Sequence, residues 1–140
     1  MKADDLKHRT KVFALRIIKL VESLPPSRVA DVIGRQLVRC GTSVGANYRA
    51  ACCAMSQTDF IAKLGIVEEE ADESVFWMEL LTETGIIRKG QIENLIDEAN
   101  QLVSIFVSSI KTARGHKRDD RQDKIRNPQS AIRNHNSEGQ

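Results

Sequence analysis

Cysteine and histidine are the residues of this chain that could perform nucleophilic or metal chemistry, and their spacing favours neither. Cys52 and Cys53 are adjacent, which is a poor geometry for a disulfide between them, and no histidine lies near a cysteine in sequence to act as its base. No CxxC pair or Glu-x-x-His motif occurs, and His8, His116 and His135 are expected to be solvated. We therefore predict that the protein is not an enzyme and has no cofactor or metal.

The segment CGTSVGAN at residues 40–47 contains two glycines four positions apart, which could indicate a phosphate-binding loop, a helix break or close packing. A phosphate loop of the Walker type needs a preceding strand and a Lys-Ser/Thr pair after the last glycine, and both are missing. An apolar seam with helical steps runs through the segment instead, which predicts one continuous helix: Val29, Ile33, Leu37, Cys40, Val44, Tyr48 and Ala51.

Three glycines fall on one flank of that seam, since a helix turns by about 100° per residue. They are Gly34, Gly41 and Gly45. Each costs up to about 1 kcal/mol of helix propensity, so a compensating gain is required. We expect that another helix approaches the backbone closely along this flank, with or without a local kink.

Basic residues are concentrated in the first part of the chain. Residues 1–63 carry eleven Lys/Arg against five Asp/Glu, whereas residues 64–110 carry two against ten. Arginines occupy the side of the second helix opposite its seam and the adjoining edge, and arginine suits bidentate contact with phosphate or carboxylate. The candidate nucleic-acid-binding residues are Arg28, Arg35, Arg39, Arg49, Lys11 and Lys19. An ordinary solvated face is the alternative interpretation.

The third helix combines an acidic run with a segment that is apolar almost all round its axis. The acidic run covers residues 68–73, and its carboxylates point in different directions, which favours a solvated or partner-facing surface over a metal site. Apolar residues on every side imply burial on more than one side. We predict an oligomer interface at Phe76, Trp77 and Leu80, and a head-to-tail contact in which the basic helices of one copy face the acidic helices of the next.

Helical periodicity extends over most of the chain and predicts four helices joined by short turns. The first covers about Asp4–Ser23 and ends at Pro25-Pro26, the second begins near Arg28, the third begins at Ser56, and the fourth carries an apolar face from Ile92 to Ile110. The predicted fold is all-α, an antiparallel up-and-down four-helix bundle of residues 1–113. From Arg114 apolar residues are sparse, so residues 114–140 are predicted to be a disordered, polar and basic tail.

The chain lacks a signal peptide pattern and has no apolar run long enough for a membrane helix. Its cysteine count is odd, which is typical of free thiols in a reducing compartment. We expect a cytoplasmic protein with no membrane partner.

Two stretches, QLVRCGTSVGANYRAA and SQTDFIAKLGIVEEEADESVFWMELL, resemble the four helix bundle protein family, also called the 23S rRNA-intervening sequence protein family. The resemblance covers about residues 4–113. It rests on the following matches to the family pattern: Ser43, Val44, Ala46, Asn47, Phe60, Leu64, Glu70, Glu73, Leu80 and Leu81. Gly45 stands where the family usually has proline, so glycine would permit a bend in the second helix without enforcing it.

The resemblance implies a bacterial four-helix bundle that assembles as a homopentamer, and it brings no catalytic residue. A related branch implies contact with a reverse-transcriptase-like protein and nucleic acid. The leading hypothesis is thus a non-enzymatic homo-oligomer whose basic surface contacts RNA or a ribonucleoprotein. The alternative is a structural adaptor that recruits a protein partner without binding nucleic acid.

Overall fold

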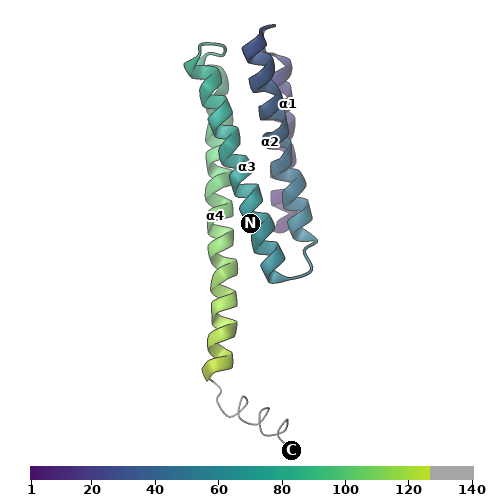
Figure 1. The fold of residues 1–140 in the computed structure, drawn as a ribbon, viewed down its shortest axis with the longest axis vertical. Helices are drawn as coiled ribbons and strands as arrows, with labels where there is room; N and C mark the ends of the chain where they lie inside the picture. The colour runs from purple at the N-terminus through teal and green to yellow at the C-terminus, as the bar shows by residue number, and fades with distance from the viewer. Residues whose placement is uncertain (127–140) are drawn as a thin grey trace, which may run out of the picture.

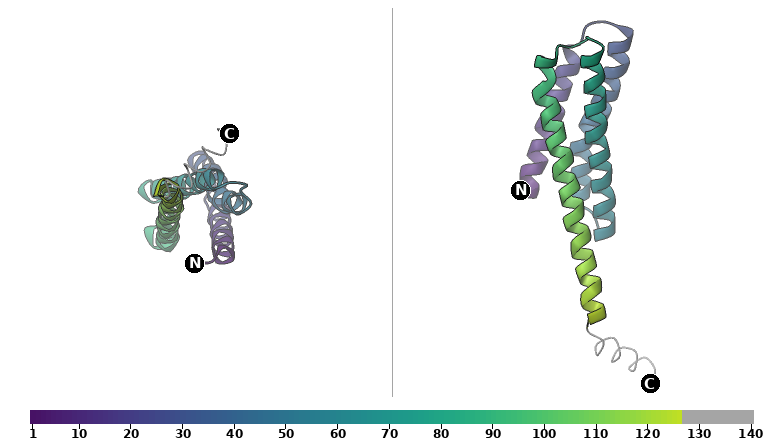
Figure 2. Two further views of the ribbon diagram at one scale, coloured as in Figure 1. Left: turned by 90° about the horizontal axis from the view of Figure 1, so that it is seen from below. Right: turned by 90° about the vertical axis from the view of Figure 1, so that its left-hand side faces the viewer.

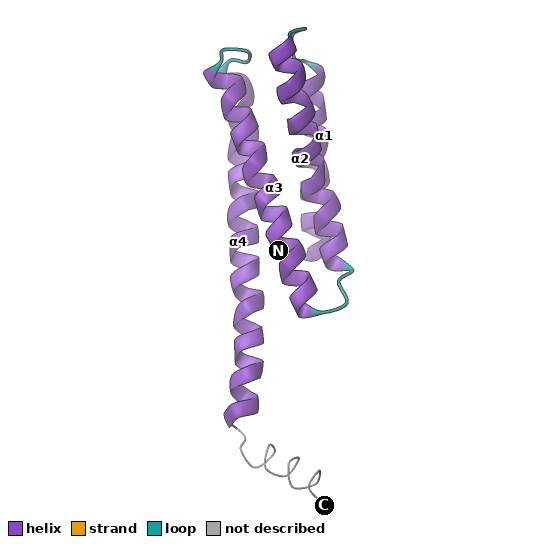
Figure 3. Cartoon of the chain, viewed as in Figure 1, coloured by secondary structure: helices purple, strands orange, loops and turns teal. Residues whose placement is uncertain are grey.

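A computed structural model of the protein describes the backbone of residues 1–126 and the side chains of residues 1–115. Four helices account for most of this range: α1 (Ala3–Glu22), α2 (Arg28–Cys52), α3 (Gln57–Glu83) and α4 (Lys89–Arg126). Figures 1 and 3 show them as an antiparallel, up-and-down arrangement joined by short loops. Residues 1–126 include no strand, so the all-α four-helix bundle is confirmed.

The helix starts follow the capping residues of the sequence. Ser27 Oγ accepts a hydrogen bond from the Ala30 amide at 3.0 Å, and Ser56 Oγ accepts one from the Asp59 amide at 3.0 Å. Each bond satisfies an amide that has no partner within its own helix. Between α3 and α4, Gly85 adopts φ 77°, a left-handed conformation that a residue with a Cβ rarely accepts.

Helix α2 runs without interruption through residues 40–47, as the seam predicts. Its glycines face α1. A Cβ added to Gly41 would lie 2.9 Å from Ile17, one added to Gly34 would lie 3.0 Å from Val21, and one added to Gly45 would lie 3.4 Å from the Thr10 carbonyl oxygen. The expectation of close helix approach is therefore confirmed, and it is tightest at Gly41.

The four helices form an open ring in cross-section. Helix α2 packs on α1 and α3, and α3 packs on α4, but α1 and α4 approach each other at only a few points. Figure 2, seen along the bundle, shows α1 and α4 on opposite arms of this arrangement. The seam between them is bridged by Arg9, whose Nη2 donates to Glu98 Oε1 at 2.6 Å and to Gln101 Oε1 at 2.8 Å.

The core contains most residues of the predicted seams, and Val29 is the one that is more than half exposed. The seam residues of α2 from Ile33 to Ala51 are buried, as are most of those of α3 and α4. The seam predicts burial of Val29, but its side chain is 55% exposed, and Ala30 is buried in its place. The reason is its position in the first turn of α2, at the end of the bundle where α3 also finishes, so that no neighbouring helix covers it.

Helix α4 continues beyond residue 113, the predicted end of the bundle. Ala113 is the last buried side chain among those described for α4, but the helix backbone reaches Arg126 and projects past the other helices in Figures 1 and 2. The sequence from 116 to 126 contains neither glycine nor proline, so no residue in that segment interrupts the helix. The rest of the predicted tail, 127–140, lies outside the described residues.

Candidate nucleic-acid and subunit interfaces

Three of the predicted basic residues form a stripe along the outside of α2. Arg28, Arg35 and Arg49 are separated by 7 and 14 positions, and such steps keep residues on nearly one side of a helix. The spacing from residue 28 to 49 corresponds to about 32 Å along the axis at about 1.5 Å per residue. All three side chains are exposed, and we call this set the basic stripe.

The two lysines of α1 are also exposed, but they do not lie on one line. Lys11 directly follows Thr10, the residue that faces Gly45 of α2, so it is rotated by about 100° from the side of α1 that contacts α2. Lys19 is eight positions further along, a rotation of about 80° around the axis, so it lies toward a different side of α1.

Arg39 differs from the other candidates because it joins α2 to α3. Its guanidinium donates to Gln36 Oε1 at 3.1 Å, to Glu70 Oε2 at 3.2 Å and to Glu73 Oε1. These bonds consume donors that a phosphate would need. Arg35 forms a weaker interaction, a solvent-exposed ion pair with Asp31 one turn earlier on the same helix. Among the described residues, Arg28, Arg49, Lys11 and Lys19 have no ion-pair partner.

The predicted interface residues of α3 lie on the outside of the bundle. Phe76 is 51% exposed and contacts Trp77 edge to face, with ring centroids 5.1 Å apart. Trp77 and Leu80 are half-buried, and Trp77 Nε1 donates to Glu73 Oε1. The structure thus leaves aromatic surface uncovered on the outside of the protomer.

This uncovered surface extends onto α2. The contact between Arg39 and Glu73 shows which side of α2 adjoins α3. Val32 lies on the same side of α2 as Arg39, because it is seven positions, or about two turns, away. Val29 and Val32 are both more than half exposed. We refer to Phe76, Trp77 and Leu80, together with these two valines, as the α3 apolar surface.

A second exposed apolar group is not evident from the sequence. Val12 and Leu15 of α1 are 37% and 57% exposed, and we refer to them as the α1 apolar surface. They form an i, i+3 pair beside the buried positions Leu6, Phe13 and Ile17, so in the sequence they resemble a wider apolar face of the same helix.

A metal site or a reactive thiol would depend on His, Cys, Asp and Glu side chains among the described residues. No cluster of three or more His, Cys, Asp or Glu side chains among them could hold a metal ion. Burial raises the pKa of the Cys40 thiol and outweighs the opposite effect of the hydrogen bond that Ser74 Oγ donates to its sulfur at 3.3 Å, so Cys40 is held as a thiol in the core.

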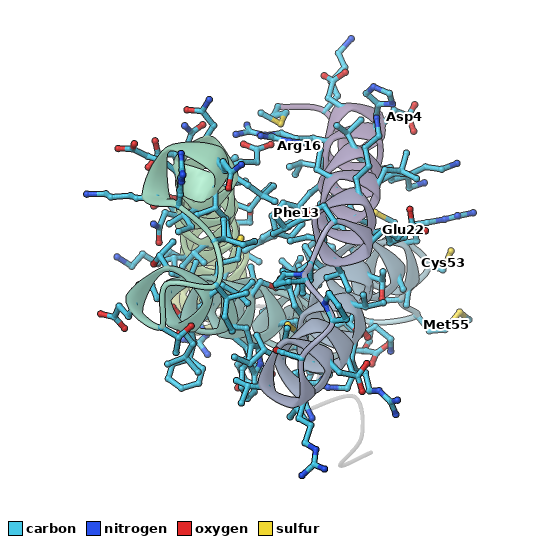
Figure 4. The ribbon with its side chains drawn as sticks, turned by 90° about the horizontal axis from the view of Figure 1, so that it is seen from above. Asp4, Phe13, Arg16, Glu22, Cys53 and Met55 are labelled. Atoms are coloured by element: carbon cyan, nitrogen blue, oxygen red, sulfur yellow. The ribbon has the colours of Figure 1, made fainter. Side chains whose placement is uncertain are left out.

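A groove lies near the lower end of the α1–α4 seam. It encloses about 590 Å³ and is lined by apolar residues such as Leu6 and Phe60 and by hydroxyl side chains of α4. None of its lining side chains is a carboxylate, imidazole, amine or thiol. In Figure 4, seen from above, Arg16 lies on the side of α1 that faces this seam, and Glu22, Cys53 and Met55 lie on the other side of the molecule.

No helix in the described part of the chain has the length and apolar character needed to cross a membrane.

Comparison with known proteins found a match between residues 4–108 and the family model described as 23S rRNA-intervening sequence protein. No curated protein matches the chain.

One similar solved structure is a crystal structure of a protein of unknown function from the S23 ribosomal protein family of Bacteroides thetaiotaomicron. It is 38% identical to this chain, with a TM-score of 0.74. The alignment covers 79% of this chain and 99% of the neighbour.

Proposed function

The chain belongs to the 23S rRNA-intervening sequence protein family, and on this premise we propose that it is a non-enzymatic homo-oligomer whose basic stripe contacts RNA or a ribonucleoprotein. The observation that carries the proposal is that one protomer exposes surfaces of two kinds. The basic stripe runs along the outside of α2, whereas Phe76 and Trp77 lie on α3, and the two surfaces adjoin only near Val29 and Val32. One surface suits a polyanion and the other suits a protein.

Two properties of the basic stripe favour phosphate contact: its residues are arginines, and their guanidinium groups form few ion pairs within the protomer. Arginine presents several donors in a planar fork, which matches two phosphate oxygens. Arg28 and Arg49 have no ion-pair partner among the described residues, and the Arg35–Asp31 pair is exposed and easily exchanged for a phosphate. The assignment of the solved neighbour to a ribosomal protein family agrees with an RNA or ribonucleoprotein partner.

Self-association is favoured by the α3 apolar surface. Exposed aromatic residues that pack on each other and on half-buried neighbours are typical centres of protein interfaces. The homopentamer implied by the family resemblance would have about five times the protomer mass of 15.7 kDa. Light scattering coupled to size-exclusion chromatography measures this mass directly.

The experiment that tests RNA contact compares two triple variants that remove the same charge. Arg28→Gln/Arg35→Gln/Arg49→Gln removes the basic stripe. The matched control replaces Arg88, Lys89 and Lys111 by Gln, because these residues are also exposed but belong to the α3–α4 turn and α4. Binding to a single-stranded RNA and to an RNA duplex is measured over a range of salt concentrations.

The stripe variant is expected to bind more weakly and to show a shallower salt dependence. The logarithmic slope should fall by about 0.7 to 0.9 for each phosphate that the variant no longer neutralises. The control variant is expected to retain most of the affinity. If the wild-type protein does not bind RNA even at low salt, the proposed interaction with nucleic acid is refuted.

A structural adaptor is the second candidate, and Arg39 is the observation that favours it. Its donors are used within the protomer, which reduces the arginine surface open to a polyanion. An adaptor would use the α3 apolar surface to recruit a protein, for example one of the reverse-transcriptase-like class that the resemblance implies. A wild-type protein that assembles normally but does not bind RNA would support the adaptor.

A further inference from the structure

We propose that the α3 apolar surface of one copy docks on the α1 apolar surface of the next copy, in a head-to-tail contact. The inference rests on the proposed self-association and adds to it the second half of the contact, Val12 and Leu15. Its basis is the set of charges that surrounds each surface.

Carboxylates surround Phe76. On a helix the neighbours of a residue lie three, four and seven positions away. For Phe76 these positions hold Leu80 and five acidic residues, all exposed except the half-buried Glu73: Glu69, Asp72, Glu73, Glu79 and Glu83. An aromatic side chain at the centre of such a ring requires a partner that is apolar in the middle and basic at the edge.

Arginines of α2 border the same surface near Val32, but two of them already form ion pairs within the protomer. Arg35 contacts Asp31, and Arg39 contacts Glu70 and Glu73. Arg28 is the only arginine of this border without an ion-pair partner among the described residues. The field around Phe76 is therefore set by the carboxylates of α3.

The surroundings of Leu15 have the complementary charge. Lys11 and Lys19 lie one turn before and one turn after it, and Arg16 lies one turn after Val12. All three are exposed and none has an ion-pair partner among the described residues. Two acids also border the surface, Asp5 and Glu22, so the basic excess is one charge.

Arg9 and Glu98, at the side of α1 that faces α4, neutralise each other and do not change this balance. Val12–Leu15 and the α3 part of its partner surface, Phe76–Leu80, each span about one helical turn, so one can lie along the other. A contact between different surfaces leaves one free surface of each kind at the ends of a dimer. Further copies then add until the assembly closes into a ring.

Two single variants and their mixture test this contact. Leu15→Glu alters only the α1 apolar surface, and Phe76→Glu alters only the α3 apolar surface; both positions are at least half exposed, so the fold should tolerate the change. Ile66→Glu is the matched control, because Ile66 is an exposed apolar residue of α3 outside both surfaces. Circular dichroism checks the helix content of each variant, and sedimentation velocity measures its mass at micromolar protomer concentration.

Each of the two variants is expected to be monomeric alone, whereas Ile66→Glu is expected to have the wild-type mass. The mixture of Leu15→Glu with Phe76→Glu is expected to form a one-to-one complex of twice the protomer mass, because one intact surface of each kind remains. This complex should grow no further, since its two outer surfaces both carry the substitution.

Two results would overturn the inference while leaving self-association intact. One is a wild-type mass for Leu15→Glu, which would show that the α3 apolar surface meets another surface. The other is a mixture in which both variants stay monomeric. A wild-type protein that is itself monomeric at these concentrations would instead refute the proposed self-association.

Discussion

Substitution of single glycines by alanine measures how closely α1 and α2 approach. Alanine adds one methyl group and improves helix propensity by about 1 kcal/mol at each position, so differences between positions report the contacts of that methyl group. At Gly41 the methyl carbon would lie 2.9 Å from both γ carbons of Ile17, which is fully buried and stiff at χ1. At Gly65 it would meet nothing within 4 Å.

The expected magnitude follows from these two terms. Overpacking of a tight core costs about 1–3 kcal/mol, so Gly41→Ala should lose about 0–2 kcal/mol of unfolding free energy after the propensity gain. Gly65→Ala should gain up to about 1 kcal/mol, which separates the two variants by about 1–3 kcal/mol. Gly34→Ala should fall between them, because its contacts, Val21 and Leu24, are only half-buried and can shift.

The assay is guanidinium unfolding followed by circular dichroism and by Trp77 fluorescence. All variants are compared at one protomer concentration, because self-association would otherwise contribute to the apparent stability. Ile17→Ala combined with Gly41→Ala completes a double-mutant cycle, and the pair should show favourable coupling because the shortened side chain makes room for the methyl group. Equal stability of Gly41→Ala and Gly65→Ala would refute close packing at Gly41.

Three further outcomes are expected. Ser56→Ala removes the acceptor of the Asp59 amide at the start of α3 and should cost about 1 kcal/mol in the same assay, whereas no loss would show that water replaces the cap. In the native protein a thiol reagent should modify the exposed Cys53 quickly and the buried Cys40 only upon unfolding, so rapid modification of Cys40 would contradict its burial. Deletion of residues 114–140 should leave the unfolding midpoint within about 1–2 °C, because the described side chains of α4 after Ala113 are not buried, and a large decrease would show that this segment docks on the bundle.

The helices themselves could be predicted because each carries an unbroken apolar seam, and because Pro25-Pro26, Ser27 and Ser56 mark the end of α1 and the starts of α2 and α3. The glycine flank of α2 was predictable for the same reason, since the helical period places Gly34, Gly41 and Gly45 together. The open seam between α1 and α4 was not predictable. Periodicity indicates which side of a helix is buried, but it does not say how many neighbours cover that side.

The candidate surfaces were predictable in part. Residue type and spacing identified the arginines of α2 and the aromatic residues of α3. The pairing of Arg39 with Glu70 and Glu73 was not visible, because it joins positions 31 and 34 residues apart and depends on the relative register of two helices. Val12 and Leu15 could not be distinguished because an isolated apolar pair beside a seam resembles a widening of that seam.

The order in which the helices pack also affects how the protein is made. Each helix packs on the one that follows it, so most tertiary contacts join segments separated by a single short turn. Proteins of such low contact order fold rapidly, in microseconds to milliseconds. The Arg9–Glu98 bridge spans 89 residues and is among the few contacts that need the whole chain. The α1–α2 hairpin can therefore form during synthesis, before α4 has been added.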